Sequence, residues 1–257
     1  MGRLDERVMI VTGGASGIGK STALLAAQEG ARVVIADRNL SGAEAVSHAA
    51  GDRAIAVRFD ATDAPSIDGV VRMAIDHFGR IDILHNNVAM TADAWARDTT
   101  VLETTLETWD LTFSVNLRSQ FIACKAVLPH MIRQGGGSII NMASGSGHKG
   151  ASGLVAYGTS KAAIMGFTRY MAVQYGRHNI RTNAIAPGVV LTEQIKSNKP
   201  ELEAATLVTL PFPRVGVSSD IAGMVVFLAS DEAAYVNGQT INCDGGATAG
   251  VAPTIRQ

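Results

Sequence analysis

Hydrophobic and polar positions follow two different periods along this chain of 257 residues. Short runs rich in β-branched residues, such as residues 32–36 (Arg-Val-Val-Ile-Ala), predict strands. The longer segments between them are typical of amphipathic helices. Strands are predicted at residues 8–11, 32–36, 53–59, 81–84, 138–143, 180–186 and 239–243, and helices at 20–30, 63–78, 106–133, 155–176 and 219–229. Because strands and helices alternate, the pattern predicts βαβ units and an α/β fold with a parallel sheet.

One segment departs from this alternation. Residues 192–213 are polar and mixed, and we interpret them as an insertion that forms a lid over a substrate. No linker, repeat or low-complexity tract divides the rest of the chain, and its length suits one α/β domain better than two. The sequence therefore predicts a single domain over residues 1–257, with the lid inside it.

Composition narrows the class of protein. Hydrophobic residues make up 47% of the chain and charged residues 18%, with a formal net charge of -1. These values argue against disorder and against nucleic-acid binding. No uncharged run is long enough to span a bilayer, and residues 1–7 mix acidic and basic side chains, unlike a signal peptide. Cys124 and Cys243 lie in apolar contexts without paired spacing, which predicts buried, reduced thiols in a cytoplasmic protein.

A glycine-rich turn, residues 12–19 (Thr-Gly-Gly-Ala-Ser-Gly-Ile-Gly), follows the first predicted strand and opens the first helix. Its glycines allow the backbone to approach a pyrophosphate closely, and the helix N-terminus offers unpaired N–H groups to the phosphates. The spacing is G-x-x-x-G-x-G rather than the commoner G-x-G-x-x-G, so the turn taken alone also fits an ordinary tight turn.

Acidic residues at the ends of the next two strands bear on the choice of cofactor. Asp37 follows the turn by about 20 residues, where a carboxylate accepts a hydrogen bond from the ribose 2′-OH and repels the extra phosphate of NADP. This favours NAD, although the neighbouring Arg38 could pair with that phosphate. Asp60 could accept a hydrogen bond from the adenine amino group, and it equally fits a turn or helix cap.

A second group of residues suits proton transfer to or from an alcohol. Tyr157 and Lys161 are at positions i and i+4 of a predicted helix and therefore share one face. A nearby ammonium lowers the pKa of a phenol from its usual value near 10. Ser144 follows a predicted strand, and its hydroxyl could hydrogen-bond a substrate oxygen. A Tyr/Lys pair alone is usually a surface feature, so the interpretation depends on Ser144 and the glycine turn together.

These motifs in this order resemble the short-chain dehydrogenase/reductase family, in its shorter, single-domain branch, over nearly the whole chain. Further matches are Asn86–Asn87, Asn116 within Ser-Val-Asn-Leu, Pro187–Gly188 with Thr192, and the run at 237–246. The resemblance implies a doubly wound Rossmann fold, with a seven-stranded parallel sheet and helices on both faces. One departure is Val88–Ala89, where the family usually has Ala-Gly.

The resemblance also implies a role for each matching residue. Tyr157 is the general acid/base, and Lys161 lowers its pKa and holds the nicotinamide ribose. Ser144 orients the substrate oxygen, while Asn116 bends its helix and anchors a water that relays protons. Ser16 stands where many NADP-using relatives carry an arginine, which favours NAD. The implied cofactor-binding residues are Gly13, Ala15, Ser16, Gly17, Ile18, Gly19, Asp37, Asp60, Ala61, Asn87, Tyr157, Lys161, Pro187, Gly188, Val190 and Thr192. No metal ligands are predicted, because the histidines lack metal-ligand spacing.

The sequence thus predicts an NAD-dependent oxidoreductase that interconverts a secondary alcohol and a ketone. One alternative is an NADP-dependent ketoreductase of the 3-oxoacyl thioester type, and another is a non-catalytic NAD-binding scaffold. A glycine-rich methyltransferase would leave the Tyr/Lys pair unexplained. The expected cleft walls, residues 90–104, 145–153 and 189–213, mix apolar side chains such as Trp95 with polar ones, so the substrate itself is not specified.

Two of the predicted helices suggest how copies of the chain associate. The helix at 155–176 carries the small residues Ala162, Ala163 and Gly166, which allow another helix to approach closely. Together with the helix at 106–133, it could form a subunit-pairing face, or it could pack within one core. Since relatives are commonly homotetramers, the resemblance favours a homotetramer.

Overall fold

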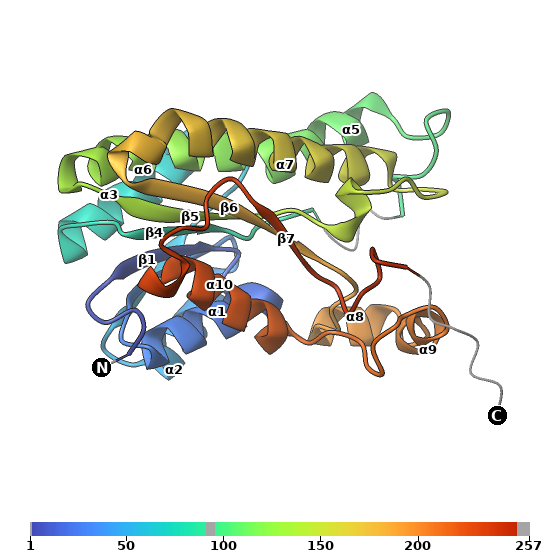
Figure 1. The fold of residues 1–257 in the computed structure, drawn as a ribbon, viewed down its shortest axis with the longest axis horizontal. Helices are drawn as coiled ribbons and strands as arrows, with labels where there is room; N and C mark the ends of the chain where they lie inside the picture. Colours follow the sequence, from blue (N-terminus) through green and yellow to red (C-terminus); the bar gives the residue numbers. More distant parts are fainter. Residues whose placement is uncertain (1, 91–95, 251–257) are drawn as a thin grey trace.

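The computed structural model describes residues 2–90 and 96–250. Within them, seven strands form a single sheet in which every pairing is parallel, in the order β3-β2-β1-β4-β5-β6-β7 (Figure 1). The strands are β1 (Val8–Thr12), β2 (Arg32–Asp37), β3 (Ala54–Arg58), β4 (Ile83–Asn86), β5 (Gly137–Met142), β6 (Ile180–Pro187) and β7 (Thr240–Cys243). The seven-stranded parallel Rossmann fold is therefore confirmed. Trp95, expected in a cleft wall, lies outside the described residues.

Helices cover both faces of this sheet. In Figure 1, α1, α2 and α10 lie below it, whereas α3, α6 and α7 lie above it. The described helices are α1 (Gly17–Gln28), α2 (Leu40–Ala50), α3 (Ala64–Phe78), α5 (Leu106–Phe113), α6 (Ser119–Gln134), α7 (Val155–Tyr175), α8 (Glu193–Asn198), α9 (Leu202–Leu207) and α10 (Ser218–Ala229). The strand order reverses between β1 and β4, and a ligand crevice forms at such a switch point beyond the carboxyl ends of the strands.

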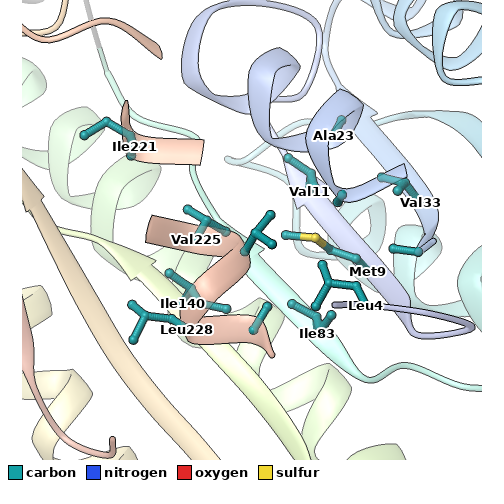
Figure 2. Close-up of a cluster of buried hydrophobic side chains, with 14 of the residues drawn as sticks. Leu4, Met9, Val11, Ala23, Val33, Ile83, Ile140, Ile221, Val225 and Leu228 are labelled. Carbon is teal, nitrogen blue, oxygen red and sulfur yellow. The ribbon is translucent and has the colours of Figure 1, made fainter. Parts of the chain in front are cut away.

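Successive residues of the central strands enter different cores. Met9 and Val11 of β1 pack with Val225 of α10 on one side of the sheet, in the cluster that Figure 2 shows. Ile10, which lies between them in β1, packs on the other side with residues of α3 and α6. Because strand side chains alternate between faces, burial on both faces explains why these strands are continuously apolar.

Among the helices that cover the sheet, α2 (Leu40–Ala50) was not predicted. Its sequence is rich in alanine and contains Gly42, and only Ala43 and Val46 are buried. The sequence does contain a start signal, because Asn39 caps the helix by accepting a hydrogen bond from the Gly42 N–H at 3.1 Å.

The long helical region predicted at 106–133 is confirmed, but it is not one continuous α-helix. A π-helical segment, Ser114–Arg118, separates α5 from α6 and contains Asn116. Short π segments are frequent at functional sites. The helical region then continues to Gln134, where Gly135 takes a left-handed conformation with φ of 88°.

The structure bears differently on the predicted lid and on the two cysteines. The region interpreted as a lid contains α8 and α9, and its role over a substrate stays a prediction. Cys124 is buried as expected, but Cys243 at the end of β7 is only partly buried, because β7 is the edge strand. No helix in the described ranges has both the length and the apolarity needed to cross a bilayer. Nor do three potential metal-ligating His, Cys, Asp or Glu side chains gather anywhere in those ranges.

Candidate functional site

The glycine-rich turn lies between β1 and α1, and its geometry requires glycine. Gly13 and Gly17 have φ angles of 67° and 52°, in the left-handed region that side chains disfavour. A Cβ on Gly19 would collide with the Gly13 carbonyl oxygen. Asn87 braces the turn, since its Nδ2 donates to the carbonyl oxygens of Thr12 and Gly13, each at 3.0 Å. The turn is thus a fixed feature of the carboxyl end of the sheet.

Several features of this turn fit a dinucleotide phosphate. Ser16 precedes α1 without a side-chain cap, and within the described residues the N–H groups of the first helical turn, Gly17 to Gly19, have no hydrogen-bond partner. Such N–H groups at a helix N-terminus bind anions. Thr192 flanks the turn, because a Cβ on Gly17 would lie 3.1 Å from its Cγ2. Thr192 also caps α8 by accepting a hydrogen bond from the Ile195 N–H at 3.2 Å.

Asp37 ends β2 beside this turn. Its Oδ2 accepts a hydrogen bond from the Ala15 N–H at 3.0 Å, and its Oδ1 accepts one from the Asn39 N–H at 2.9 Å. Each carboxylate oxygen has two lone pairs, so both can accept a further hydrogen bond. The structure therefore holds a carboxylate rigidly where the ribose contact was predicted.

The residues after β3, Asp60 to Thr62, form a turn that the Asp60 side chain stabilises. Asp60 accepts hydrogen bonds from the Thr62 N–H at 2.8 Å and from its hydroxyl at 2.7 Å, and these bonds lower the pKa of the Asp60 carboxyl. The Phe59 N–H donates to the Asp37 carbonyl oxygen at 3.0 Å, which keeps this strand end beside β2. The adenine contact of Asp60 and the cofactor contact of Ala61 stay predictions.

The candidate proton-transfer residues meet at the first turns of α7. Ser144, just beyond β5, forms a hydrogen bond with the Tyr157 hydroxyl. Lys161 lies on the same face of α7, with its Nζ 5.5 Å from the centre of the Tyr157 ring. That Nζ also donates to the Met142 carbonyl oxygen at 2.7 Å. Segments that are distant in the sequence thus bring one hydroxyl, one phenol and one amine together.

The expected electrostatics of the pair need a correction. Burial raises the pKa of the Tyr157 hydroxyl above its usual value, and the Ser144 hydrogen bond opposes that rise. Burial also lowers the pKa of the Lys161 amine to about 7, so close to neutral pH a large fraction of it is uncharged. In the protein alone, the Ser144 hydrogen bond therefore favours the phenolate, and the predicted effect of Lys161 on the Tyr157 pKa stays a prediction.

Asn116 is buried and holds two segments together. Its Oδ1 accepts a hydrogen bond from the Met90 N–H at 2.7 Å, and its Nδ2 donates to the Ser160 hydroxyl at 2.9 Å. The Ser160 hydroxyl in turn donates to the Tyr157 carbonyl oxygen at 2.7 Å. The side chain of Asn116 therefore supports the Tyr157 backbone, while its predicted role in anchoring a water stays a prediction.

The carboxyl end of β6 lies beside the loop that carries Ser144. A Cβ on Gly145 would lie 3.5 Å from the Pro187 carbonyl oxygen, so the loop after Ser144 runs beside the end of β6. Gly188 packs so closely on the next loop that a Cβ there would lie 3.0 Å from the Asp244 Cα. Val190 is buried and bridges to Gly216. The carboxyl ends of β1, β4, β5 and β6 thus lie together at one end of the sheet.

Comparisons with known proteins agree with this geometry. A family model described as "Enoyl-(Acyl carrier protein) reductase" matches residues 13–248. A probable short-chain type dehydrogenase/reductase from Bradyrhizobium diazoefficiens is 41% identical, covering 98% of this chain and 90% of the relative.

The chain belongs to the short-chain dehydrogenase/reductase family.

Other members of this family have more specific names. A sorbitol dehydrogenase from Cereibacter sphaeroides is 40% identical, over 95% of this chain and 98% of its own. A 3-oxoacyl-[acyl-carrier-protein] reductase from Thermotoga maritima is 38% identical, also over 95% and 98%. The protein is accordingly a short-chain dehydrogenase/reductase that acts on CH–OH groups, and NAD or NADP is the typical cofactor of its family.

The departure from the family pattern at Val88–Ala89 is accommodated locally. The Val88 side chain packs against the core formed with α3 and α6. Its N–H donates to the Thr12 hydroxyl at 3.3 Å, and the Asn87 N–H donates to the same hydroxyl at 3.0 Å. The backbone at this position is therefore tied to β1 despite the larger side chain.

Sequence reasoning missed two buried residues near this short-chain dehydrogenase/reductase site. Asp98 accepts hydrogen bonds from the N–H groups of Ala156 and Tyr157. Because Asp98 lies 58 residues before Ala156, no local sequence motif predicts that it caps this helix. His85, in β4, is fully buried, and neither of its ring nitrogens has a hydrogen-bond partner among the described residues. Its apolar neighbours in the sequence, Ile83 and Leu84, were the available signal that it faces a core.

Proposed function

We propose that this short-chain dehydrogenase/reductase interconverts a secondary alcohol and a ketone, with NAD as cofactor and Tyr157 as the general acid/base. The observation that carries the proposal is the hydrogen bond between Ser144 and the Tyr157 hydroxyl, with Lys161 on the same helix face. The glycine turn, Asp37, Asn87 and the end of β6 would hold the cofactor. When bound, NAD supplies the acceptor or donor of the hydride.

The residues of the chain account for the proton. During alcohol oxidation, Tyr157 takes the hydroxyl proton of the substrate, and Ser144 stabilises the phenolate by its hydrogen bond. During ketone reduction, Tyr157 returns the proton, and the Ser144 hydroxyl donates where negative charge develops on the substrate oxygen. Lys161 lies one helical turn after Tyr157 in α7. Its pKa of about 7 allows it to gain or lose a proton at neutral pH.

A panel of secondary alcohols and ketones, assayed with NAD and NADP at the nicotinamide absorbance, tests this function directly. Turnover with at least one substrate class and a preference for NAD are expected. Turnover only with 3-oxoacyl thioesters and NADP would replace the proposal by the ketoreductase alternative, which the similarity to the Thermotoga maritima enzyme supports. NAD binding without turnover across the panel would favour the non-catalytic scaffold.

The preference for NAD is expected to depend on Asp37. Asp37→Ala should narrow the ratio of kcat/KM with NAD to that with NADP by about tenfold or more, because a hydrogen bond to a charged acceptor contributes about 1.5–3 kcal/mol. Asp37→Asn should give a similar result while keeping an acceptor for the Ala15 N–H. Asp76→Ala, at an exposed position of α3, is the control. An unchanged ratio in both Asp37 variants would show that another residue discriminates.

We also propose that copies of the chain pair through α5, α6 and α7. These helices line an open, mainly apolar groove that contains Phe113, Leu117, Phe121 and Phe167. The Phe121 side chain is 51% exposed, and its ring centre lies 6.1 Å from that of Phe167. An exposed apolar surface of this kind is typical of a subunit interface. The homotetramer implied by the family resemblance could use this face.

Light scattering at micromolar concentration tests the pairing. The wild-type protein is expected to show about four times the monomer mass of 26.8 kDa, and Phe121→Glu should lower that mass because it places a charge in the groove. Met73→Glu, at an exposed apolar residue of α3, should leave the mass unchanged. A wild-type mass of one monomer would rule out the homotetramer.

Three coarser predictions complete the proposal. A single domain is supported by the one sheet to which all seven described strands belong. A lid at residues 192–213 is supported by the contact between Thr192 and the glycine turn. A cytoplasmic location is supported by Cys124 and Cys243, which are both free thiols.

A further inference from the structure

Asp98 is buried at the N-terminal end of α7, the helix that carries Tyr157 and Lys161. Only 2% of its surface is exposed. Its Oδ1 accepts a hydrogen bond from the Ala156 N–H at 2.9 Å, and its Oδ2 accepts one from the Tyr157 N–H at 2.8 Å. Its backbone carbonyl oxygen accepts a third, from the Leu154 N–H at 2.9 Å. One residue thus binds three N–H groups at the start of a helix far along the chain.

The start of α7 has no local means of satisfying these groups. Leu154 occupies the N-cap position, where serine, threonine, asparagine or aspartate normally supplies a side-chain oxygen. Leucine has no such oxygen, and Leu154 also has a φ angle of 63°, in the left-handed region that is costly for a side chain. The surrounding structure must stabilise such a conformation, and the three hydrogen bonds of Asp98 do so.

The backbone of Tyr157 is consequently held from both sides. Asp98 binds its N–H, and the Ser160 hydroxyl binds its carbonyl oxygen. Ser160 is in turn linked through Asn116 to the Met90 N–H. Met90 and Asp98 belong to the same connection between β4 and α5, so this connection reaches Tyr157 by two separate routes.

We propose that Asp98 is a positioning residue, which fixes the first turn of α7 so that the Tyr157 hydroxyl stays in register with Ser144. This inference rests on the proposed role of Tyr157 as the general acid/base. Displacing a catalytic group by about 1 Å can lower a rate about 10²-fold. Loss of the Asp98 cap frees the backbone N–H of Tyr157 itself, so a displacement of that order is expected at this residue.

A buried aspartate elsewhere in the chain provides a matched control. Asp82 is 3% exposed, and its Oδ2 accepts a hydrogen bond from the Val8 N–H at 2.9 Å. Asp82 lies just before β4, at the amino ends of the strands. Ser144 and Tyr157 lie at the other end of the sheet, beyond the carboxyl ends of the strands. Removing its carboxylate should destabilise the fold by a similar mechanism without moving α7.

The experiment compares Asp98→Ala, Asp98→Asn and Asp82→Ala on the full chain, with the most active alcohol from the panel. For Asp98→Ala we expect kcat to fall about 10²-fold, as a displacement near 1 Å would produce, while the NAD dissociation constant changes less than about twofold. Asp98→Asn, which keeps one acceptor oxygen, should recover a substantial part of kcat. Asp82→Ala should lose stability and keep the wild-type kcat at a temperature where it is folded.

Amide hydrogen exchange in the absence of substrate gives an independent readout. Asp98→Ala should accelerate exchange in the peptide at residues 154–161, and Asp82→Ala should not. A wild-type protein without any turnover would contradict the proposed function, yet the exchange result would still decide whether Asp98 fixes α7. The positioning role is overturned if Asp98→Ala leaves kcat within about threefold of wild type, if Asp82→Ala lowers kcat equally, or if exchange at 154–161 is unchanged.

Discussion

Replacing Tyr157 by phenylalanine should lower kcat for alcohol oxidation by about 10²–10⁴-fold, the contribution typical of a positioned general acid or base. The variant keeps the aromatic ring, and therefore most of the packing at the start of α7, but loses the hydroxyl that Ser144 binds. NAD binding should change little, because the glycine turn, Asp37 and Asn87 are on other elements. Steady-state kinetics and NAD titration by fluorescence measure the two effects separately.

Ser144→Ala is the informative companion to this variant. The Ser144 hydrogen bond lowers the pKa of the Tyr157 hydroxyl, whereas burial raises it, so removing Ser144 should raise that pKa further. Since alcohol oxidation requires the phenolate, the rise of kcat/KM with pH should move to higher pH in Ser144→Ala. Turnover of Tyr157→Phe within about tenfold of wild type would exclude Tyr157 as the base.

Replacing His85 by valine should make the fold considerably less sensitive to acid. Burial lowers the pKa of His85 to about 3, and its ordinary value in an unfolded chain is about 6.5. The folded protein therefore keeps the imidazole neutral, while the unfolded chain binds a proton as the pH falls below 6.5. The stability contributed by the neutral imidazole is complete above pH 6.5 and is lost progressively between pH 6.5 and about 3.

The size of this effect follows from the difference between the two pKa values. At pH 4, preferential protonation of the unfolded chain should cost the folded protein about 3 kcal/mol relative to pH 7. His85→Val removes that cost, and valine suits a β-strand position between Val11 and Ile140. The variant should also avoid burying two ring nitrogens that lack hydrogen-bond partners among the described residues.

Urea unfolding of wild type and His85→Val at pH 7 and pH 4 measures this difference, and the carboxylates that titrate in the same range cancel in the comparison. Lys161, with a pKa of about 7 in the folded protein, changes stability only at higher pH and does not overlap. His178→Gln, at an exposed histidine, is the control. Equal losses of stability in wild type and His85→Val between pH 7 and pH 4 would contradict a neutral, buried His85.

The elements that were predicted well depend on local sequence periods. The strand at 8–12 is an apolar run that ends at Thr12 before Gly13, and the strand at 180–187 ends at Pro187; both were found to within about a residue. The pair Tyr157 and Lys161 shares one face of α7 because helical spacing alone requires it. By contrast, α2 was missed, and only two of its residues, Ala43 and Val46, are buried.

The sequence by itself determined the order of the strands and of the helices other than α2, α8 and α9, the position of the glycine turn, and the shared helix face of Tyr157 and Lys161. These follow from short-range spacing, which each segment carries within itself. Only the tertiary structure decided that Asp98 caps α7, that His85 is buried, and that burial raises the Tyr157 pKa while the Ser144 hydrogen bond opposes the rise. Burial and hydrogen bonding between distant segments set these properties, because a pKa or a cap depends on what surrounds a group in space.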